Sequence, residues 1–276
     1  MADINLGINI NFKPSKKQYE AWQYLTDQET EFIGYGGAAF SGKTYLLGYF
    51  LTSMSIAYPD TGWGLGRKEL TILKKTTLIT MFKVFDECNI IHGRDFEFNQ
   101  QLNVITFYNK SQIFLIDTAY APNDPLFTRL GGYELTGCAV DESAETHHAA
   151  IDILYTRIGR RKNKEYGIKK KFLETFNPAK NHVYDRYYKP LKDGKQKAGH
   201  QFVKALPADN PSPDVPDYVK GILANGTTVT IERLIYGNFE FDDDPLTMMD
   251  YDKNLELFTN TFIQPTPEKY LIADIA

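Results

Sequence analysis

The sequence predicts an α/β protein in which a mostly parallel β-sheet is covered by helices on both faces. Segments with strand patterning alternate along the chain with segments of helical periodicity, as they do in parallel sheets whose crossovers are helices. A glycine-rich turn at residues 37–44 follows one predicted strand and leads directly into a predicted helix. The continuous apolar segment at residues 135–140 is typical of a strand buried on both faces of such a sheet.

The predicted elements follow one another in a clear order. Ser15 is a candidate N-cap for a first helix that runs through Leu25. Alternation predicts three short strands between residues 96 and 117, with a turn at Asn109-Lys110, and we interpret these antiparallel hairpins as an insertion or an addition at the sheet edge. Further helices are predicted at 43–57, 69–88, 144–158, 182–188, 218–223 and 230–236, and strands at 31–35, 62–66, 96–98, 103–108, 112–117, 135–140, 171–175 and 201–206.

The composition excludes several classes of protein. No apolar run approaches the roughly 18 residues that a membrane span requires. The N-terminus lacks the basic segment and apolar core of a secretory signal, and two cysteines make neither a disulfide framework nor a metal cluster. The net charge of −4 argues against binding nucleic acid through overall charge, although a local basic face remains open. We therefore expect a cytoplasmic protein without a membrane partner.

The glycine-rich turn matches the pattern G-x-x-x-x-G-K-[ST] in full. Its glycines let backbone N–H groups turn inward around phosphate oxygens at the positive end of a helix. Lys43, expected to be exposed at the mouth of the loop, would reach the β- and γ-phosphates, and Thr44 would bind Mg²⁺. The sequence thus predicts a P-loop nucleotide hydrolase of the RecA-like type that uses ATP and Mg²⁺. The predicted nucleotide-binding loop comprises Gly37, Ala38, Ala39, Phe40, Ser41, Gly42, Lys43 and Thr44.

Two carboxylates, Asp141 and Glu142, follow the apolar strand at 135–140. In P-loop enzymes such a strand lies beside the phosphate loop. Asp141 is predicted to hold Mg²⁺ together with Thr44. Glu142 is predicted to orient and deprotonate the attacking water, which is the task of a general base.

Beyond these motifs, the chain resembles the ATPase domain of the large terminase subunit, the DNA-packaging motor of tailed bacteriophages. The resemblance implies that Gln18 contacts the adenine, where an amide that both donates and accepts would favour ATP over GTP. It also implies that Thr175 and Asn177 belong to a coupling motif that senses the γ-phosphate. The segments that carry the resemblance are residues 14–18, Gly66-Arg67-Lys68, the hairpin at 103–117, Thr175-Phe-Asn-Pro178, Asp209-Asn-Pro211 and Gly237-Asn-Phe239.

The phosphate loop departs from this family at one point. Many terminases carry an arginine inside the loop, whereas this loop has alanine and phenylalanine there. An arginine that stabilises transition-state charge must therefore come from elsewhere in the chain or from a neighbouring subunit. Arg129, just before the acidic strand, and Arg157, on the helix after it, are the candidates within the chain.

The end of the chain carries a further expectation. Prolines punctuate residues 207–216, and we divide the chain into an ATPase core at 1–206, a lid subdomain at 207–241, a linker at 242–268 and a final strand at 269–276. In large terminases a strand of this last type opens the RNase H-like nuclease domain, where its aspartate, here Asp274, is a metal ligand. We therefore expect an ATPase-domain fragment without nuclease activity of its own.

A basic stretch lies between the acidic strand's helix and the next strand. DNA phosphates are the natural partner for such a stretch, and the alternatives are a solvated loop of ordinary charges, the portal ring or a neighbouring subunit. The stretch comprises Arg157, Arg160, Arg161, Lys162, Lys164, Lys169, Lys170 and Lys171.

The resemblance implies an ATPase that drives double-stranded DNA into a viral procapsid. Its partners would be the portal protein and the small terminase subunit, and it would form a homo-oligomeric ring on the capsid, while the isolated chain is expected to be monomeric. It would lie in the host cytoplasm and transiently at the procapsid portal. Another P-loop motor or helicase-like ATPase, and a non-catalytic nucleotide-binding module, remain alternatives; the intact loop and acidic pair argue against the second, and the shortness of the chain after Asn238 against a helicase.

Overall fold

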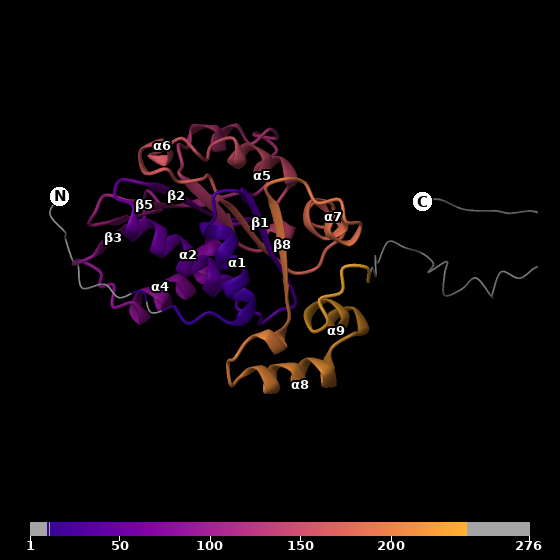
Figure 1. The fold of residues 1–276 in the computed structure, drawn as a ribbon. Helices are drawn as coiled ribbons and strands as arrows, with labels where there is room; N and C mark the ends of the chain where they lie inside the picture. The colour runs from indigo at the N-terminus through magenta and orange to yellow at the C-terminus, as the bar shows by residue number, and fades with distance from the viewer. Residues whose placement is uncertain (1–9, 11, 242–276) are drawn as a thin grey trace, which may run out of the picture. The chain divides into compact units, whose positions relative to one another are not determined.

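A computed structural model describes residues 10 and 12–241 of the chain (Figure 1). Its strands form one eight-stranded sheet in the order β3-β4-β5-β2-β6-β7-β1-β8. All neighbours from β5 to β8 pair in parallel, whereas β3 and β4 are antiparallel and extend one edge. This confirms the predicted mostly parallel sheet and the edge addition. The strands are β1 (Phe32–Gly37), β2 (Gly62–Arg67), β3 (Phe96–Asn99), β4 (Val104–Phe107), β5 (Gln112–Asp117), β6 (Gly137–Val140), β7 (Phe172–Phe176) and β8 (His200–Ala205).

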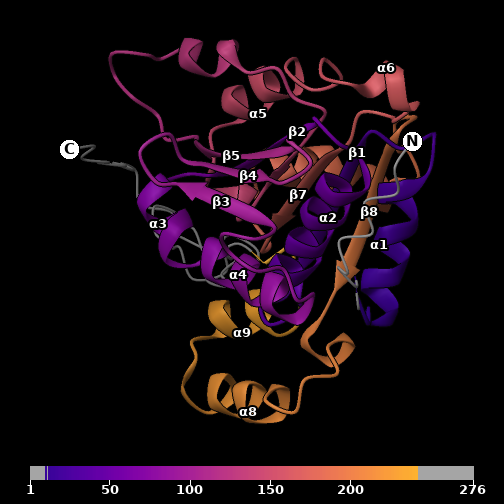
Figure 2. The same ribbon diagram turned by 90° about the vertical axis from the view of Figure 1, so that its left-hand side faces the viewer.

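Helices cover both faces of the sheet (Figure 2). One apolar core joins the sheet to α1, α2 and α4, and a second core on the opposite face joins it to α5 and the segment around Tyr187. Because both faces are covered, β1 and β7 are buried along their whole length. The helices are α1 (Lys16–Thr26), α2 (Lys43–Ala57), α3 (Leu70–Lys75), α4 (Thr77–Glu87), α5 (His148–Tyr155), α6 (Asn163–Tyr166), α7 (Lys189–Lys192), α8 (Val215–Asn225) and α9 (Thr228–Leu234).

Three predicted helices differ from the structure. The helix predicted at 69–88 is divided into α3 and α4 at Thr76, whose backbone leaves the helical region with φ −129° and ψ −74°. The helix predicted at 144–158 is shorter because a 3₁₀ turn at Ser143–Glu145 precedes α5. The segment predicted as helix at 182–188 is helical, but Tyr184–Tyr188 form a π-helical turn that continues into α7.

The segment after β8 reaches back to the glycine-rich loop. Residues 207–241, which we call the lid segment, carry α8 and α9 beyond the carboxyl end of β8 (Figure 2). The N–H of Ala39 in the loop donates to the carbonyl of Leu234 at 3.0 Å. The division of the chain at residue 206 stays a prediction, and the predicted linker at 242–268, the final strand and Asp274 lie outside the described residues. Within residues 10 and 12–241, no helix has the length and hydropathy of a membrane span.

Candidate nucleotide-binding and hydrolysis site

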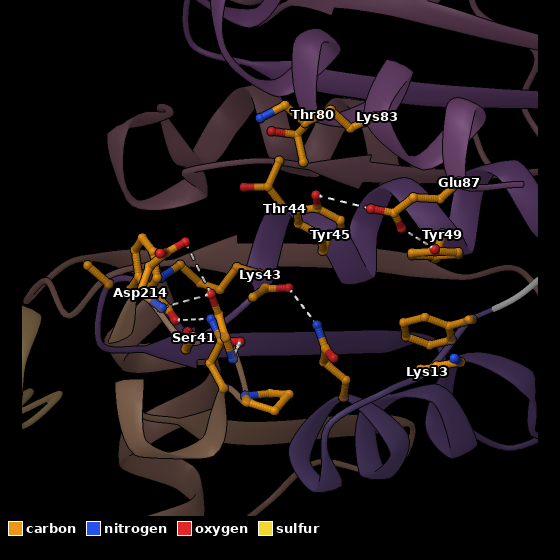
Figure 3. Close-up of a pocket in the computed structure, with 18 of the residues that line it drawn as sticks. Lys13, Ser41, Lys43, Thr44, Tyr45, Tyr49, Thr80, Lys83, Glu87 and Asp214 are labelled. Atoms are coloured by element: carbon orange, nitrogen blue, oxygen red, sulfur yellow. Dashed lines mark hydrogen bonds between the residues drawn. The ribbon is translucent and has the colours of Figure 1, made fainter. Parts of the chain in front are cut away.

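A cavity of about 890 Å³ opens at the carboxyl end of the parallel strands. The loop after β1, the first turn of α2, one side of α4 and the lid segment line it. Figure 3 shows Thr44 of α2 beside Thr80 and Lys83 of α4, with Ser41 and Asp214 at the other end of the group of side chains. Parallel α/β sheets bind ligands at this edge, so the fold places the predicted loop where a nucleotide is held.

Two glycines give the phosphate loop its path. Gly37 has φ +130°, and a Cβ there would lie 2.3 Å from the carbonyl oxygen of Ala205. Gly42 has φ +76°, and a Cβ there would lie 2.6 Å from the amide nitrogen of Gln18. Only glycine fits at either position without a shift of its neighbours. The loop then enters α2, whose free N–H groups and positive dipole end face the cavity.

Lys43 is buried, with 6% of its surface exposed, which corrects the expectation of an exposed lysine at the loop mouth. Its ammonium group donates to the carbonyl oxygen of Ala38 at 2.8 Å and to Oδ1 of Asn177 at 2.9 Å. Burial lowers the pKa of Lys43, while the charges of Glu142 and Asp141 oppose that shift. An incoming phosphate can replace these two acceptors with charged oxygens, which bind an ammonium group more strongly.

The sheet register places Arg67, Asp141 and Thr175 in one row. Gly66 pairs with Val140 and Val140 pairs with Glu174, so the next residue of each strand falls at the same level. Asp141, 1% exposed, accepts hydrogen bonds from the hydroxyls of Thr175 and Thr77, both at 2.6 Å. Arg67 lies 3.5 Å from the same carboxylate.

Glu142 follows Asp141 and faces the cavity. Its carboxylate accepts a hydrogen bond of 3.1 Å from the side-chain amide of Asn177. Burial raises the pKa of Glu142, as does the charge of Asp141, while Lys43 and Arg67 lower it. A carboxylate with a raised pKa is a better general base, so the surroundings of Glu142 suit proton abstraction from water.

The residues present fit a magnesium ion that binds together with phosphates. No group of three or more His, Cys, Asp or Glu side chains that could hold a metal occurs in the described part of the chain. Such a P-loop site needs only a hydroxyl and a carboxylate from the protein, and Thr44 and Asp141 would supply them. When bound, Mg²⁺ would neutralise charge on the phosphate oxygens.

Gln18 holds the phosphate loop to α1. Its Oε1 accepts from the N–H of Ser15 at 2.9 Å, and its Nε2 donates to the carbonyl oxygen of Gly42 at 2.9 Å. Ser15 and Gln18 form a capping box, which satisfies two free N–H groups at the start of α1. These two hydrogen bonds leave one amide hydrogen and one lone pair of Gln18 for an adenine base. The adenine contact itself stays a prediction.

We expect Gln18→Ala to lower the free energy of unfolding by about 1 kcal/mol without any nucleotide present, since it removes a capping interaction and a tie between α1 and the loop. Urea unfolding of the two proteins measures this. Lys16→Ala, an exposed substitution on the first turn of the same helix, is the control and should change stability by less than about 0.5 kcal/mol. Equal losses for both variants would contradict this role of Gln18.

The lid segment contacts the phosphate loop through Phe40 as well as through Ala39. The ring of Phe40 stacks on Tyr218 of α8 with centroids 4.8 Å apart, and its carbonyl oxygen accepts from the side chain of Asn210 at 2.7 Å. Arg233 of α9 donates to the carbonyl oxygen of Pro178, next to Asn177, at 2.8 Å. Movement of the lid segment would therefore act on the loop and on the end of β7 together.

Neither predicted arginine is brought to the acidic pair. Arg129 pairs with Asp124 at 2.9 Å and also donates to the carbonyl oxygen of Ala119. Arg157 lies beside the start of β6, opposite to the end that carries Asp141, and donates to the carbonyl oxygen of Gly131 at 2.8 Å. Arg67 is the arginine at the site, and its Nε is buried without a hydrogen-bond partner.

The basic stretch is mostly paired with acidic groups. Arg161 donates to Asp60 at 2.8 Å, Lys169 and Lys170 contact Glu31, and Lys171 is buried against Asp27. These pairs lie at the amino ends of the strands, at the opposite edge from the cavity. These ion pairs offset part of the positive charge, and a DNA contact by the stretch stays a prediction.

Comparison with solved structures finds similar folds among phage proteins. The large terminase of a thermophilic bacteriophage, in complex with ADP, superposes with a TM-score of 0.62 at 17% identity over 82% of this chain and 53% of that chain. The large terminase ATPase domain of Thermus phage P74-26 gives 0.58 at 12% identity over 83% of this chain and 95% of that chain. The chain has the fold of a large-terminase ATPase domain. The bacteriophage HK97 large terminase gives 0.54 at 12% identity over 78% of this chain and 44% of that chain.

These similarities lie in structure and not in sequence. No family model and no curated protein matches the sequence. The chain spans about half the length of the ADP-bound terminase and is matched by nearly the whole P74-26 ATPase domain. The likeness therefore establishes the fold, and the chemistry must be argued from the residues of this chain.

Proposed function

We propose that this chain hydrolyses ATP as the ATPase domain of a large terminase, and that the longer protein uses this hydrolysis to move double-stranded DNA into a viral procapsid. Lys43 and the loop N–H groups would bind the phosphates, and Thr44 and Asp141 would hold Mg²⁺. Glu142 would orient and deprotonate the attacking water.

One observation carries the hydrolytic part of this proposal. The side chain of Asn177 accepts from the ammonium group of Lys43 at 2.9 Å and donates to the carboxylate of Glu142 at 3.1 Å. A single amide thus joins the lysine that would read the γ-phosphate to the carboxylate that would act as base. A bound γ-phosphate would compete with Asn177 for the ammonium group of Lys43. Through its hydrogen bond to Glu142, Asn177 would then couple the binding of phosphate to the position of that carboxylate. A module that only binds nucleotide needs no such link.

The finer proposals rest on the likeness to terminases whose structures hold ADP or ATP-gamma-S. Double-stranded DNA, the portal protein, the small terminase subunit and a homo-oligomeric ring would be the partners of the longer protein. It would work in the host cytoplasm and transiently at the procapsid portal. An arginine from a neighbouring subunit would complete the site, because Arg67 is occupied with Asp141 and no arginine lies in the loop.

The test is ATP turnover by the purified chain with and without linear double-stranded DNA, with Glu142→Gln as the background. We expect slow Mg²⁺-dependent turnover that exceeds that of Glu142→Gln, while both proteins bind the nucleotide with similar affinity. Turnover equal to that of Glu142→Gln would contradict the assignment of the base and favour a non-catalytic binding module. Turnover of the purified chain that is the same with and without linear double-stranded DNA would contradict the role in a DNA motor.

A further inference from the structure

Glu142 has a strained backbone. Its φ of 49° and ψ of 46° place it in the left-handed region. For a residue with a side chain this conformation costs about 1–2 kcal/mol relative to the right-handed helix. Such strain persists only where the surroundings fix it, and it concentrates at functional sites. The residues on either side of Glu142 show what fixes it here.

Two consecutive residues of β7 hold the two neighbours of Glu142. The hydroxyl of Thr175 donates to Asp141 at 2.6 Å, and Glu174 accepts a hydrogen bond from the hydroxyl of Ser143. Consecutive strand residues point to opposite faces of a sheet, so the two contacts are made on opposite sides of β7. Asp141 is 1% exposed, and Ser143, Glu174 and Thr175 are fully buried.

Glu174 is itself rigidly held. Arg186 donates to its Oε1 at 2.8 Å, and the hydroxyl of Tyr187 donates to the same oxygen at 2.7 Å. Nε2 of His182 lies 3.5 Å from Oε2, the oxygen that accepts from Ser143. With these partners the carboxylate cannot follow Ser143 if the turn moves, and it acts as a fixed anchor on the α5 side of the sheet.

We infer that Ser143 and Glu174 are positioning residues for hydrolysis, which hold Glu142 in its left-handed conformation by anchoring the turn after it to β7. This inference rests on the proposed function, in which Glu142 is the base. From this conformation the carboxylate of Glu142 meets the amide of Asn177. Release of the anchor would let the backbone relax into a helical conformation and carry the carboxylate away from the attacking water.

Ser143→Ala tests the inference, with Ser111→Ala as the matched control. Ser111 is also fully buried and donates to the carbonyl oxygen of Ser55 at 2.6 Å, but it lies at the start of β5, far along the strand from the cavity. We expect Ser143→Ala to lower kcat for ATP about tenfold, the factor that corresponds to about 1.4 kcal/mol, with KM and nucleotide affinity within twofold of wild type. Ser111→Ala should leave kcat within about twofold. Equal kcat losses in both variants, or an unchanged kcat in Ser143→Ala, would overturn the inference.

A crystal structure of Ser143→Ala gives a readout that does not depend on turnover. The inference expects φ of Glu142 to become negative and its carboxylate to leave Asn177; a φ that stays near 49° would overturn it even if kcat fell. The two hypotheses fail separately. If wild type shows no hydrolysis while the backbone of Ser143→Ala relaxes, the proposed function is wrong and the anchoring by Ser143 stands.

Discussion

Lys43→Ala is expected to lower ATP turnover at least about a thousandfold at neutral pH, which is the lower end of the effect of an arginine that stabilises transition-state charge in phosphoryl transfer. The ammonium group sits at the centre of the site, with Ala38 and Asn177 as its acceptors and Asp141 and Glu142 nearby. Its loss removes the charge that would bind the γ-phosphate and the hydrogen-bond donor that orients the side chain of Asn177. Steady-state turnover measures the effect, and circular dichroism checks that the variant is folded.

The pH dependence of the residual turnover gives a second expected result for the same variant. Burial and Asp141 raise the pKa of Glu142, and Lys43 is the first of the charges that lower it. Removal of Lys43 therefore raises this pKa further. A base must be deprotonated, so turnover is lost as the pH falls through that pKa, and the acid limb of the profile should move to higher pH in Lys43→Ala.

Lys83→Ala is the matched control for this prediction. Lys83 lines the same cavity from α4 and carries the same charge, but it is exposed, whereas Lys43 is buried and donates to Asn177. We expect its turnover to stay within about tenfold of wild type. A loss in Lys83→Ala as large as that in Lys43→Ala would show that net positive charge in the cavity, and not the position of Lys43, governs hydrolysis.

Local sequence patterns are sufficient to predict the sheet and the position of Asp141 and Glu142 at the end of a buried strand. The glycine spacing of the phosphate loop predicts a loop between a strand and a helix. The continuous apolar segment before Asp141 predicts a parallel strand that is buried on both faces. The antiparallel edge strands β3 and β4 also follow from alternation and from the Asn109-Lys110 turn.

Contacts between distant parts of the chain could not be predicted in the same way. The ammonium group of the buried Lys43 donates to Asn177, which is 134 residues away. Arg129 and Arg157 are candidates from the sequence because both lie close to the acidic strand along the chain. Arg157 lies beside the start of β6, whereas Asp141 follows the end of that strand. The two ends of a strand lie at opposite edges of the sheet, so Arg157 is remote from the acidic pair.

The fully buried Glu174 also lacked a sequence signal, and its replacement should have the largest effect on stability. Glu174→Ala is expected to lower the free energy of unfolding by about 3–5 kcal/mol, the cost of breaking a buried ion pair by removing one partner. The variant leaves Arg186 without its partner at 2.8 Å and the buried hydroxyls of Tyr187 and Ser143 without an acceptor. Urea unfolding at neutral pH measures the loss.

Asp152→Ala provides the control, because Asp152 binds the same Arg186 at 2.9 Å but has 60% of its side chain exposed. Its loss should lower the free energy of unfolding by less than about 1 kcal/mol.

Burial alone would raise the pKa of Glu174, but hydrogen bonding to His182 and the charge of Arg186 lower it from 4.5 to about 2. The stability that ionised Glu174 contributes is therefore present above pH 4.5 and is lost as the pH falls toward 2, so the gap between wild type and Glu174→Ala should narrow in that window. A gap that stays constant across the window, or equal losses in Glu174→Ala and Asp152→Ala, would show that the buried carboxylate does not hold this part of the fold together.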